Sequence, residues 1–166
     1  MAQPYHIRAA VAEDLPALLA IYNHAVLQSV ATFDLKPRTE AAGLAWFTAH
    51  TGHHPLFVAE VQGAVAGYAS LSPYRPMPAY ASTAELSLYI HPDYQRRGLG
   101  RALAEHTLAF ARASEHLHLI VSVITASHTV SLALHEKLGF RRCGTLHEAG
   151  YKFGAFHDVV HLELRV

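Results

Sequence analysis

Apolar residues in the first third of the chain recur mainly at intervals of three and four positions. Between positions 15 and 26 this spacing predicts a helix with one apolar face, in which Pro16 is tolerated because it lies in the first turn. A second helix is expected from Thr39, a residue that caps helices well, to about His50. Residues Tyr5–Ala9 are expected to form a strand that precedes both helices.

Alternating apolar and polar residues dominate the middle of the chain. Residues Pro55–Val61 and Ala64–Leu71 flank the tight turn Gln62-Gly63, which predicts an antiparallel hairpin. Segment 72–80 contains three prolines and is expected to be a loop. Residues Ser82–Ile90 form a further strand. One of its faces carries Leu86, Leu88 and Ile90, and the other carries Glu85, Ser87 and Tyr89.

The last part of the chain repeats the change from helix to strand. A helix follows Gly98 with one apolar side, and residues Leu117–Ile124 form a nearly continuous apolar run that is typical of a buried strand. Residues His128–Leu138 indicate a helix that Gly139 ends, and Val159–Val166 is the closing strand.

The resulting order, β-α-α-β-β-β-α-β-α-β-β, predicts an α/β fold: a mixed sheet that helices cover. Within it, Ser82 to Ile124 is expected to form a right-handed parallel crossover.

Composition narrows the class of protein. The chain has 166 residues, 51% hydrophobic and 16% charged, which fits one folded domain over residues 1–166. Its 13 basic and 13 acidic residues balance, so no general field favours nucleic acid or an anionic membrane. Cys143 is the only cysteine, and no apolar run approaches the length of a membrane span. The cytoplasm is therefore the expected location.

The strongest chemical signal is the turn Gln95–Gly100, between a strand and a helix. A helix N-terminus leaves amide N–H groups unpaired, and the two glycines allow a ligand to approach the backbone, so a phosphate or pyrophosphate site is expected. The alternative is a glycine turn that merely starts a helix. Against it stand three cations that oppose the helix dipole unless an anion is bound: Arg96, Arg97 and Arg101. The spacing matches neither a P-loop nor a dinucleotide-binding GxGxxG turn.

Two linked motifs give the chain a resemblance to a known superfamily. Gln95, Gly98 and Gly100 match the [Q/R]-x-x-G-x-[G/A] hallmark of the GCN5-related N-acetyltransferases (GNAT), and SHTVSLALHEKLGF resembles their N-x-x-[AS]-x-x-L-Y-x-K-x-G-F helix. The segments STAELSLYIHPDYQRRGLG, LHEKLGF and GYKFGAFHDVVHLEL are similar to the phosphinothricin and methionine sulfoximine acetyltransferases. The likeness covers nearly the whole chain. It implies a mostly antiparallel sheet of about seven strands, a fourth strand that splays from the fifth, and about four flanking helices.

The resemblance implies acetyl-CoA as the co-substrate. Its pantetheine arm would pair with backbone groups of Tyr89, Ile90 and His91 in the splayed region. Amides of the turn would hold the pyrophosphate, which assigns Gln95, Arg96, Arg97, Gly98, Leu99 and Gly100 to the cofactor. Ser131 would contribute too, although by residue type alone it is a solvent-facing serine. His128 stands where the family has Asn, and either its imidazole N–H or a water would replace that contact.

Glu85 is the candidate general base. A shielded carboxylate has a raised pKa, and related acetyltransferases place a substrate-facing Glu here; the alternative is an ordinary solvated carboxylate. A backbone N–H near Tyr89 would stabilise the oxyanion. His135 is the candidate general acid for the departing thiolate, or else an ordinary buried histidine. Cys143 has no neighbouring base in the sequence and is expected to be inert.

The acceptor implied by the resemblance is an amino acid with a tetrahedral sulfur or phosphorus group. Arg75 in the proline-rich loop, next to Tyr74, would pair with its carboxylate, and Phe33 would line its pocket. Lys152, in the loop between the last two strands, would reach the site or a neighbouring subunit, and a homodimer is expected. The alternatives are that Tyr74 and Phe33 only cover the sheet and that Arg75 is a solvated charge.

Several functions stay open at this point. The first is transfer of acetyl to a small amino-acid-like amine. Another amine, from a polyamine or a protein, is the second, and a CoA-binding sensor without catalysis is the third. The chain has 14 histidines but contains neither an HExxH nor a CxxC motif, so no metal is expected.

Overall fold

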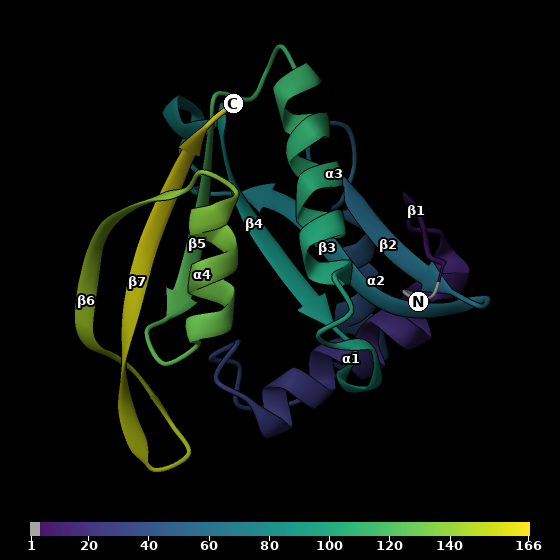
Figure 1. Ribbon diagram of the computed structural model, residues 1–166, viewed down its shortest axis with the longest axis horizontal. Coiled ribbons are helices and arrows are strands. Elements are labelled where there is room, and N and C mark those ends of the chain that lie inside the picture. The colour runs from purple at the N-terminus through teal and green to yellow at the C-terminus, as the bar shows by residue number, and fades with distance from the viewer. Residues whose placement is uncertain (1–3) are drawn as a thin grey trace.

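A seven-stranded mixed sheet organises the computed structural model, which describes residues 4–166 (Figure 1). The strand order is β1-β2-β3-β4-β5-β7-β6, and only β4 and β5 are parallel, so the expected mostly antiparallel sheet is confirmed. The strands are β1 (His6–Ala9), β2 (Leu56–Val61), β3 (Ala64–Pro73), β4 (Thr83–Ile90), β5 (Leu119–Thr125), β6 (Arg141–Lys152) and β7 (Ala155–Arg165).

Four α-helices cover the two faces of this sheet. They are α1 (Leu15–Gln28), α2 (Glu40–Thr48), α3 (Leu99–Ala113) and α4 (Thr129–Lys137), and the short 3-10 turns are η1 (Ala12–Asp14), η2 (Pro78–Tyr80) and η3 (Pro92–Tyr94). In Figure 1, α3 and α4 lie in front of the sheet and α2 lies behind it. None of the helices within residues 4–166 is long and apolar enough to cross a membrane.

The alternation along β4 separates two hydrophobic clusters. Leu86 packs with α3 residues such as Leu103 in the larger cluster, on the α3 and α4 side. Tyr89 packs against the smaller cluster, which contains Leu18 and Ile21 of α1. Because neighbouring side chains of a strand point to opposite faces, β4 contributes side chains to both clusters.

Local signals fixed several helix ends as expected. The Thr39 hydroxyl accepts a hydrogen bond from Ala42 N–H at 3.2 Å, so Thr39 caps α2. Gly139 follows α4 with a φ of +96°, the left-handed conformation that glycine tolerates. Helix α2 ends at Thr48, earlier than expected. Strand β3 extends to Pro73, because β2 pairs with β3 only as far as Ser70 and no partner there needs the missing N–H.

The C-terminal hairpin differs most from the sequence-based expectation. Strands β6 and β7 leave only Phe153 and Gly154 between them, and β7 begins at Ala155 instead of Val159. Lys152 is therefore the last residue of β6 and not part of a loop. The register of this hairpin shifts between Leu146 and Gly150, where the extra residues of β6 form a bulge.

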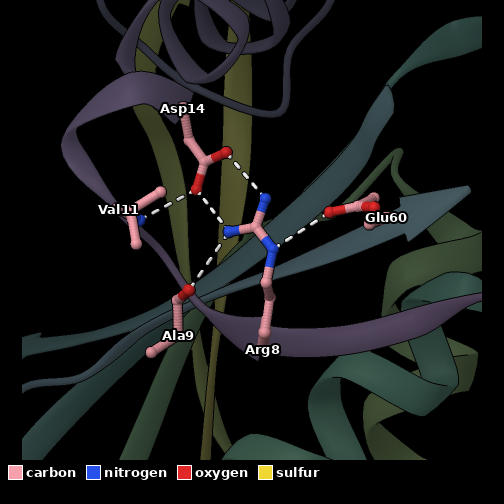
Figure 2. A network of polar contacts seen from close by, with 5 residues as sticks. All are labelled: Arg8, Ala9, Val11, Asp14 and Glu60. Carbon is pink, nitrogen blue, oxygen red and sulfur yellow. Dashed lines mark hydrogen bonds and ion pairs between the residues drawn. The ribbon is translucent and has the colours of Figure 1, made fainter. Parts of the chain in front are cut away.

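A polar network ties the start of the chain to the sheet (Figure 2). The Arg8 guanidinium donates to both carboxylate oxygens of Asp14, at 2.7 and 2.9 Å, and to Glu60 at 3.0 Å. Asp14 also accepts the Val11 N–H at 2.8 Å and is 6% exposed. The Arg8 contact holds the pKa of the Asp14 carboxyl below its ordinary value. The network thereby joins β1, β2 and the turn that precedes α1.

Candidate active site

Strands β4 and β5 separate partway along their length. They pair only from Thr83 with Leu119 to Glu85 with Val121, although β4 continues to Ile90 and β5 to Thr125. On its other edge β4 stays paired with β3 as far as Ile90. The separation, called here the β4–β5 gap, confirms the expected splay.

The peptide groups that face this gap follow from the hydrogen bonds at both ends of β4. His91 N–H donates to Ala66 C=O, and Thr83 C=O accepts from Tyr74 N–H, so the odd-numbered residues of β4 are bonded to β3. The peptide groups of the even-numbered residues then point toward β5. Beyond Ala84, those of Leu86, Leu88 and Ile90 point into the gap. Of the three residues expected to pair with a pantetheine arm, only Ile90 faces the gap; Tyr89 and His91 do not, because the alternation places them on the β3 side.

A cavity of about 230 Å³ occupies the gap. Its walls come from both faces of the sheet, and they include Glu85, Ser131, His135, Tyr89 and Phe33. Five of the sequence-predicted site residues thus meet around one space. The further residues of the wall are Ala31, Thr32, Leu86, Ser87, Leu88, Val123, Ile124, Thr125 and Val159.

Glu85 lies where the gap begins, and its side chain is half-buried. Among residues 4–166 no donor is hydrogen-bonded to its carboxylate. Burial raises the pKa of Glu85, and electrostatic interactions with Arg75 and His161 partly oppose that rise. A shielded, unpaired carboxylate beside a cavity is suited to accept a proton near neutral pH.

His135 is almost fully buried in α4 and has a defined tautomer. Its Nδ1 is 2.8 Å from Ser131 C=O, a contact that only a protonated Nδ1 can make. Burial lowers the pKa of His135, which favours the neutral ring. Nε2 then carries a lone pair and accepts hydrogen bonds, so the neutral ring has no proton to give at the atom that the general-acid role requires.

The turn before α3 presents free amide groups. The first backbone hydrogen bond of the helix joins Ala102 N–H to Gly98 C=O, so Gly98, Leu99 and Gly100 have no backbone acceptor for their N–H groups within residues 4–166. Gly98 has a φ of +84° and nothing within 4 Å of the position that a Cβ would occupy.

Gln95 plays a different part in this turn. Its N–H donates to Pro92 C=O at 3.3 Å, and its side-chain amide lies 3.4 Å from Ile90 C=O. The Gln95 amide is therefore not free for a phosphate, which corrects that assignment. Arg96 has a φ of +60°, and the Arg97 guanidinium lies over the Tyr94 ring at 5.3 Å.

Segment 29–38, between α1 and α2, forms the wall opposite β4 and is anchored on several sides. Thr125 donates to Val30 C=O at 2.6 Å, and Lys152 Nζ donates to Thr32 C=O at 2.7 Å. The Tyr22 hydroxyl contacts Thr32 Oγ1 at 3.0 Å and donates to Asp34 at 2.5 Å. Lys152 is 3% exposed, so it holds this wall from behind and is not among the residues that line the cavity.

The remaining predicted residues lie nearer the rim. Tyr74 and Arg75 follow β3, and the Arg75 guanidinium lies 5.0 Å from the Tyr74 ring centre. Arg75 is exposed and outside the cavity wall, yet its charge acts on Glu85. His128 is exposed at the start of α4 and its side chain makes no capping hydrogen bond. Within residues 4–166, no three His, Cys, Asp or Glu side chains gather as metal ligands would.

Sequence reasoning missed the polar part of the cavity wall. Thr32 and Thr125 are distant in sequence, and each is brought to the wall by a long-range hydrogen bond with no sequence motif. Ser87 could have been found, because it alternates with Glu85 and Tyr89 on one face of β4.

Comparisons with known proteins agree on one family. The family model described as the acetyltransferase (GNAT) family matches residues 18–140. The L-methionine sulfoximine/L-methionine sulfone acetyltransferase of Pseudomonas paraeruginosa is 36% identical over 162 residues, 96% of this chain and 94% of the relative. The phosphinothricin N-acetyltransferase of Streptomyces coelicolor is 37% identical over 161 residues, covering 95% and 94%. A GNAT phosphinothricin acetyltransferase of Sinorhizobium meliloti, solved with acetyl-CoA, has a TM-score of 0.93 and 33% identity, covering 100% and 89%.

Proposed function

The chain belongs to the acetyltransferase (GNAT) family and is an acetyl-CoA-dependent N-acetyltransferase; from this premise we propose that its acceptor is a small amino-acid-like amine. The acceptor class is that of phosphinothricin, methionine sulfoximine or methionine sulfone, on which the relatives act by name. One observation carries the proposal: an unpaired, half-buried carboxylate, Glu85, stands where β4 and β5 separate, beside a cavity of about 230 Å³.

The residues around the gap suit the cofactor. The outward peptide groups of Leu88 and Ile90 offer hydrogen bonds to an extended amide-containing arm, as a neighbouring strand would. Amides of Gly98, Leu99 and Gly100 offer the N–H groups that a pyrophosphate accepts from, with Arg96 and Arg97 adding positive charge. Ser131 and His128 at the start of α4 would complete the site. When bound, acetyl-CoA supplies an acetyl group activated as a thioester.

Glu85 would act as the general base. The acceptor enters as an ammonium and must lose a proton before its nitrogen can attack the thioester carbon. Glu85 would take that proton, directly or through a water, because its raised pKa matches the task. A gap-facing N–H of β4 would stabilise the charge that develops on the carbonyl oxygen. His135, as a neutral ring with Nδ1 protonated, would orient the turn at Ser131 through its hydrogen bond to Ser131 C=O. The thiolate of CoA would then depart without receiving a proton from His135.

The acceptor would bind against segment 29–38. Phe33 and Tyr89 would contact its apolar part, and Arg75 would pair with its carboxylate from the rim. Tyr74 would orient Arg75 by stacking. Lys152 would act indirectly, by fixing Thr32.

We also expect a homodimer in the cytoplasm. The β6–β7 hairpin exposes a set of large apolar side chains that a partner would cover: Leu146, Tyr151, Phe153 and Phe156 are 55–63% exposed. A single-species monomer mass in sedimentation equilibrium at micromolar concentration would contradict the dimer. The double variant Tyr151→Ser/Phe156→Ser is expected to weaken the association.

Thiol release from acetyl-CoA tests the acceptor. The purified protein would be assayed with phosphinothricin, methionine sulfoximine and methionine sulfone, and with spermidine and a lysine-containing peptide as the other amine classes. Turnover confined to the first three supports the proposal. Preference for spermidine or the peptide would show that the acceptor belongs to another class of amine. Tight acetyl-CoA binding without turnover on any amine would favour a CoA-binding sensor without catalysis.

A further inference from the structure

The β6–β7 hairpin grips the cavity wall through two adjacent contacts. Lys152 donates to Thr32 C=O, and two residues earlier on the same face Gly150 lies beneath the next residue, Phe33. A Cβ at Gly150 would be 2.5 Å from Phe33 Cε2 and 2.7 Å from Cδ2 and Cζ. The Phe33 ring therefore packs directly on the Gly150 backbone. His157, the register partner of Gly150, adds a ring contact with Phe33 at 6.0 Å between centres.

The Phe33 ring lies between the β6–β7 hairpin and the cavity. Its neighbours in segment 29–38 are fixed through Val30, Thr32 and Asp34, each of which is hydrogen-bonded to another element. The hairpin blocks one side of the ring, and the ring itself forms part of the cavity wall that also contains Glu85. A methyl group at position 150 needs about 1 Å more separation to reach ordinary contact distance. That displacement would push the ring toward the acceptor space.

A bulge in β6 determines which residue lies beneath Phe33. After Leu146 the register shifts, and the Asp158 carboxylate accepts the Glu148 N–H at 2.8 Å and contacts His147 Nδ1 at 2.9 Å. The shift amounts to two residues of β6, so without the bulge Glu148 and not Gly150 would lie opposite His157. The bulge therefore brings a glycine, and not a neighbouring residue with a side chain, against the ring.

We propose that Gly150 is a specificity-determining position, which sets the size of the acceptor space by letting the Phe33 ring lie back against the hairpin. The inference rests on the proposed function, in that the cavity is taken to hold the acceptor. Gly150 touches neither substrate and acts only through Phe33. An alanine there narrows the space beside Glu85 and selects against acceptors with a bulky side chain.

The test uses Gly150→Ala, Phe33→Leu and the double variant, with Gly144→Ala as the control. Gly144 is on the same strand, and nothing lies within 4 Å of its Cβ position. Gly150→Ala is expected to raise the KM for methionine sulfone at least tenfold while the Kd for acetyl-CoA stays within twofold. In the Phe33→Leu background the same change should have little effect, because no ring remains to be displaced. Gly144→Ala should behave as wild type.

An unchanged KM in Gly150→Ala, or an equal rise with and without the Phe33 ring, would overturn the inference. A crystal structure of Gly150→Ala gives a readout that needs no turnover. The Phe33 ring should shift toward Glu85, and an unmoved ring would overturn the inference as well. Turnover of the wild type tests the proposed function separately, since its failure would leave the ring displacement measurable.

Discussion

Glu85 and Val121 form the last register pair between β4 and β5. Beyond this pair the two strands diverge, and the peptide groups of β4 no longer pair with a strand on that side. The pair thus places a carboxylate at the closed end of the gap, with free backbone donors further along the same strand. A thioester lying along those donors would lead directly toward Glu85, so fold and proposed chemistry meet at this one residue pair.

Replacing Glu85 with Gln should lower kcat by about 10²–10⁴-fold, because the amide cannot accept the ammonium proton. The Kd for acetyl-CoA should not change, since the carboxylate is not assigned to cofactor binding. Steady-state kinetics and calorimetric titration measure the two quantities. Glu105→Gln, an exposed carboxylate on α3, serves as the control and should retain wild-type kcat. A Glu85→Gln enzyme with normal turnover would remove Glu85 from the mechanism.

The pH dependence of kcat/KM should reflect the raised pKa of Glu85. The base works only when ionised, so kcat/KM should fall as pH drops through a pKa above the ordinary Glu value of about 4.3. The same shift has the opposite sign for stability. The folded state holds the extra proton between the two pKa values, so stability falls as pH rises through that window. Glu85→Gln should therefore unfold at a higher temperature than wild type at pH 8 and at a similar temperature near pH 4. Equal melting temperatures at pH 8 would argue against a desolvated carboxylate.

Gly98→Val should weaken acetyl-CoA binding at least about tenfold, because a side chain would stand in front of the free amides. The substitution also strains the backbone, since φ is +84°. Gly63→Val separates the two effects: Gly63 has a φ of +80° and equally open surroundings, but it lies in the β2–β3 turn. Both variants should lose thermal stability, and only Gly98→Val should lose affinity. Equal affinities would place the pyrophosphate elsewhere.

His135→Asn should change kcat by less than about threefold, because an Asn amide can replace the Nδ1–H donor to Ser131 C=O. The substitution removes Nε2, the atom that a general acid would use. A loss of about 100-fold, with Ser131 still in place, would instead show that Nε2 takes part in proton transfer. Rapid-quench measurement of the acetylated product checks the chemical step itself.

Arg8→Met should lower the free energy of unfolding by about 2–4 kcal/mol at pH 7, because it leaves the buried Asp14 carboxylate without its cation. Arg101→Met, which breaks an exposed pair with Glu105, should leave the free energy of unfolding almost unchanged. The folded-state pKa of Asp14 is lowered, so its contribution is present above the unfolded pKa of about 3.9 and disappears as pH falls through the folded value. Urea titrations should show that the unfolding free energies of wild type and Arg8→Met differ at pH 7 and converge at lower pH.

Much of the fold could be predicted because its signals are local. The cap at Thr39, the glycine after α4 and the alternation along β4 each act within a few residues, and each is found as expected. Strand β6 gave no such signal. Almost all of its residues are exposed, so no alternation of apolar and polar positions marks it.

The candidate site divides in the same way. Motif spacing placed Glu85, Ser131 and His135 around one cavity, but the direction of each peptide group along β4 depends on its pairing with β3. That pairing is a long-range property, and the expected Tyr89 and His91 groups proved to face the wrong strand. The contact of Lys152 with Thr32 joins residues 120 positions apart, and no spacing rule reaches that far.

The cavity in the β4–β5 gap is lined from both faces of the sheet: Ser131 and His135 from the α4 side, Phe33 and Thr32 from the α1–α2 side. Under the proposed function the thioester would reach Glu85 from the α4 side and the acceptor from the α1–α2 side, so each would bind in the presence of the other. Such an arrangement suits a reaction in which both molecules sit in the protein at once and the acyl group never rests on the enzyme itself.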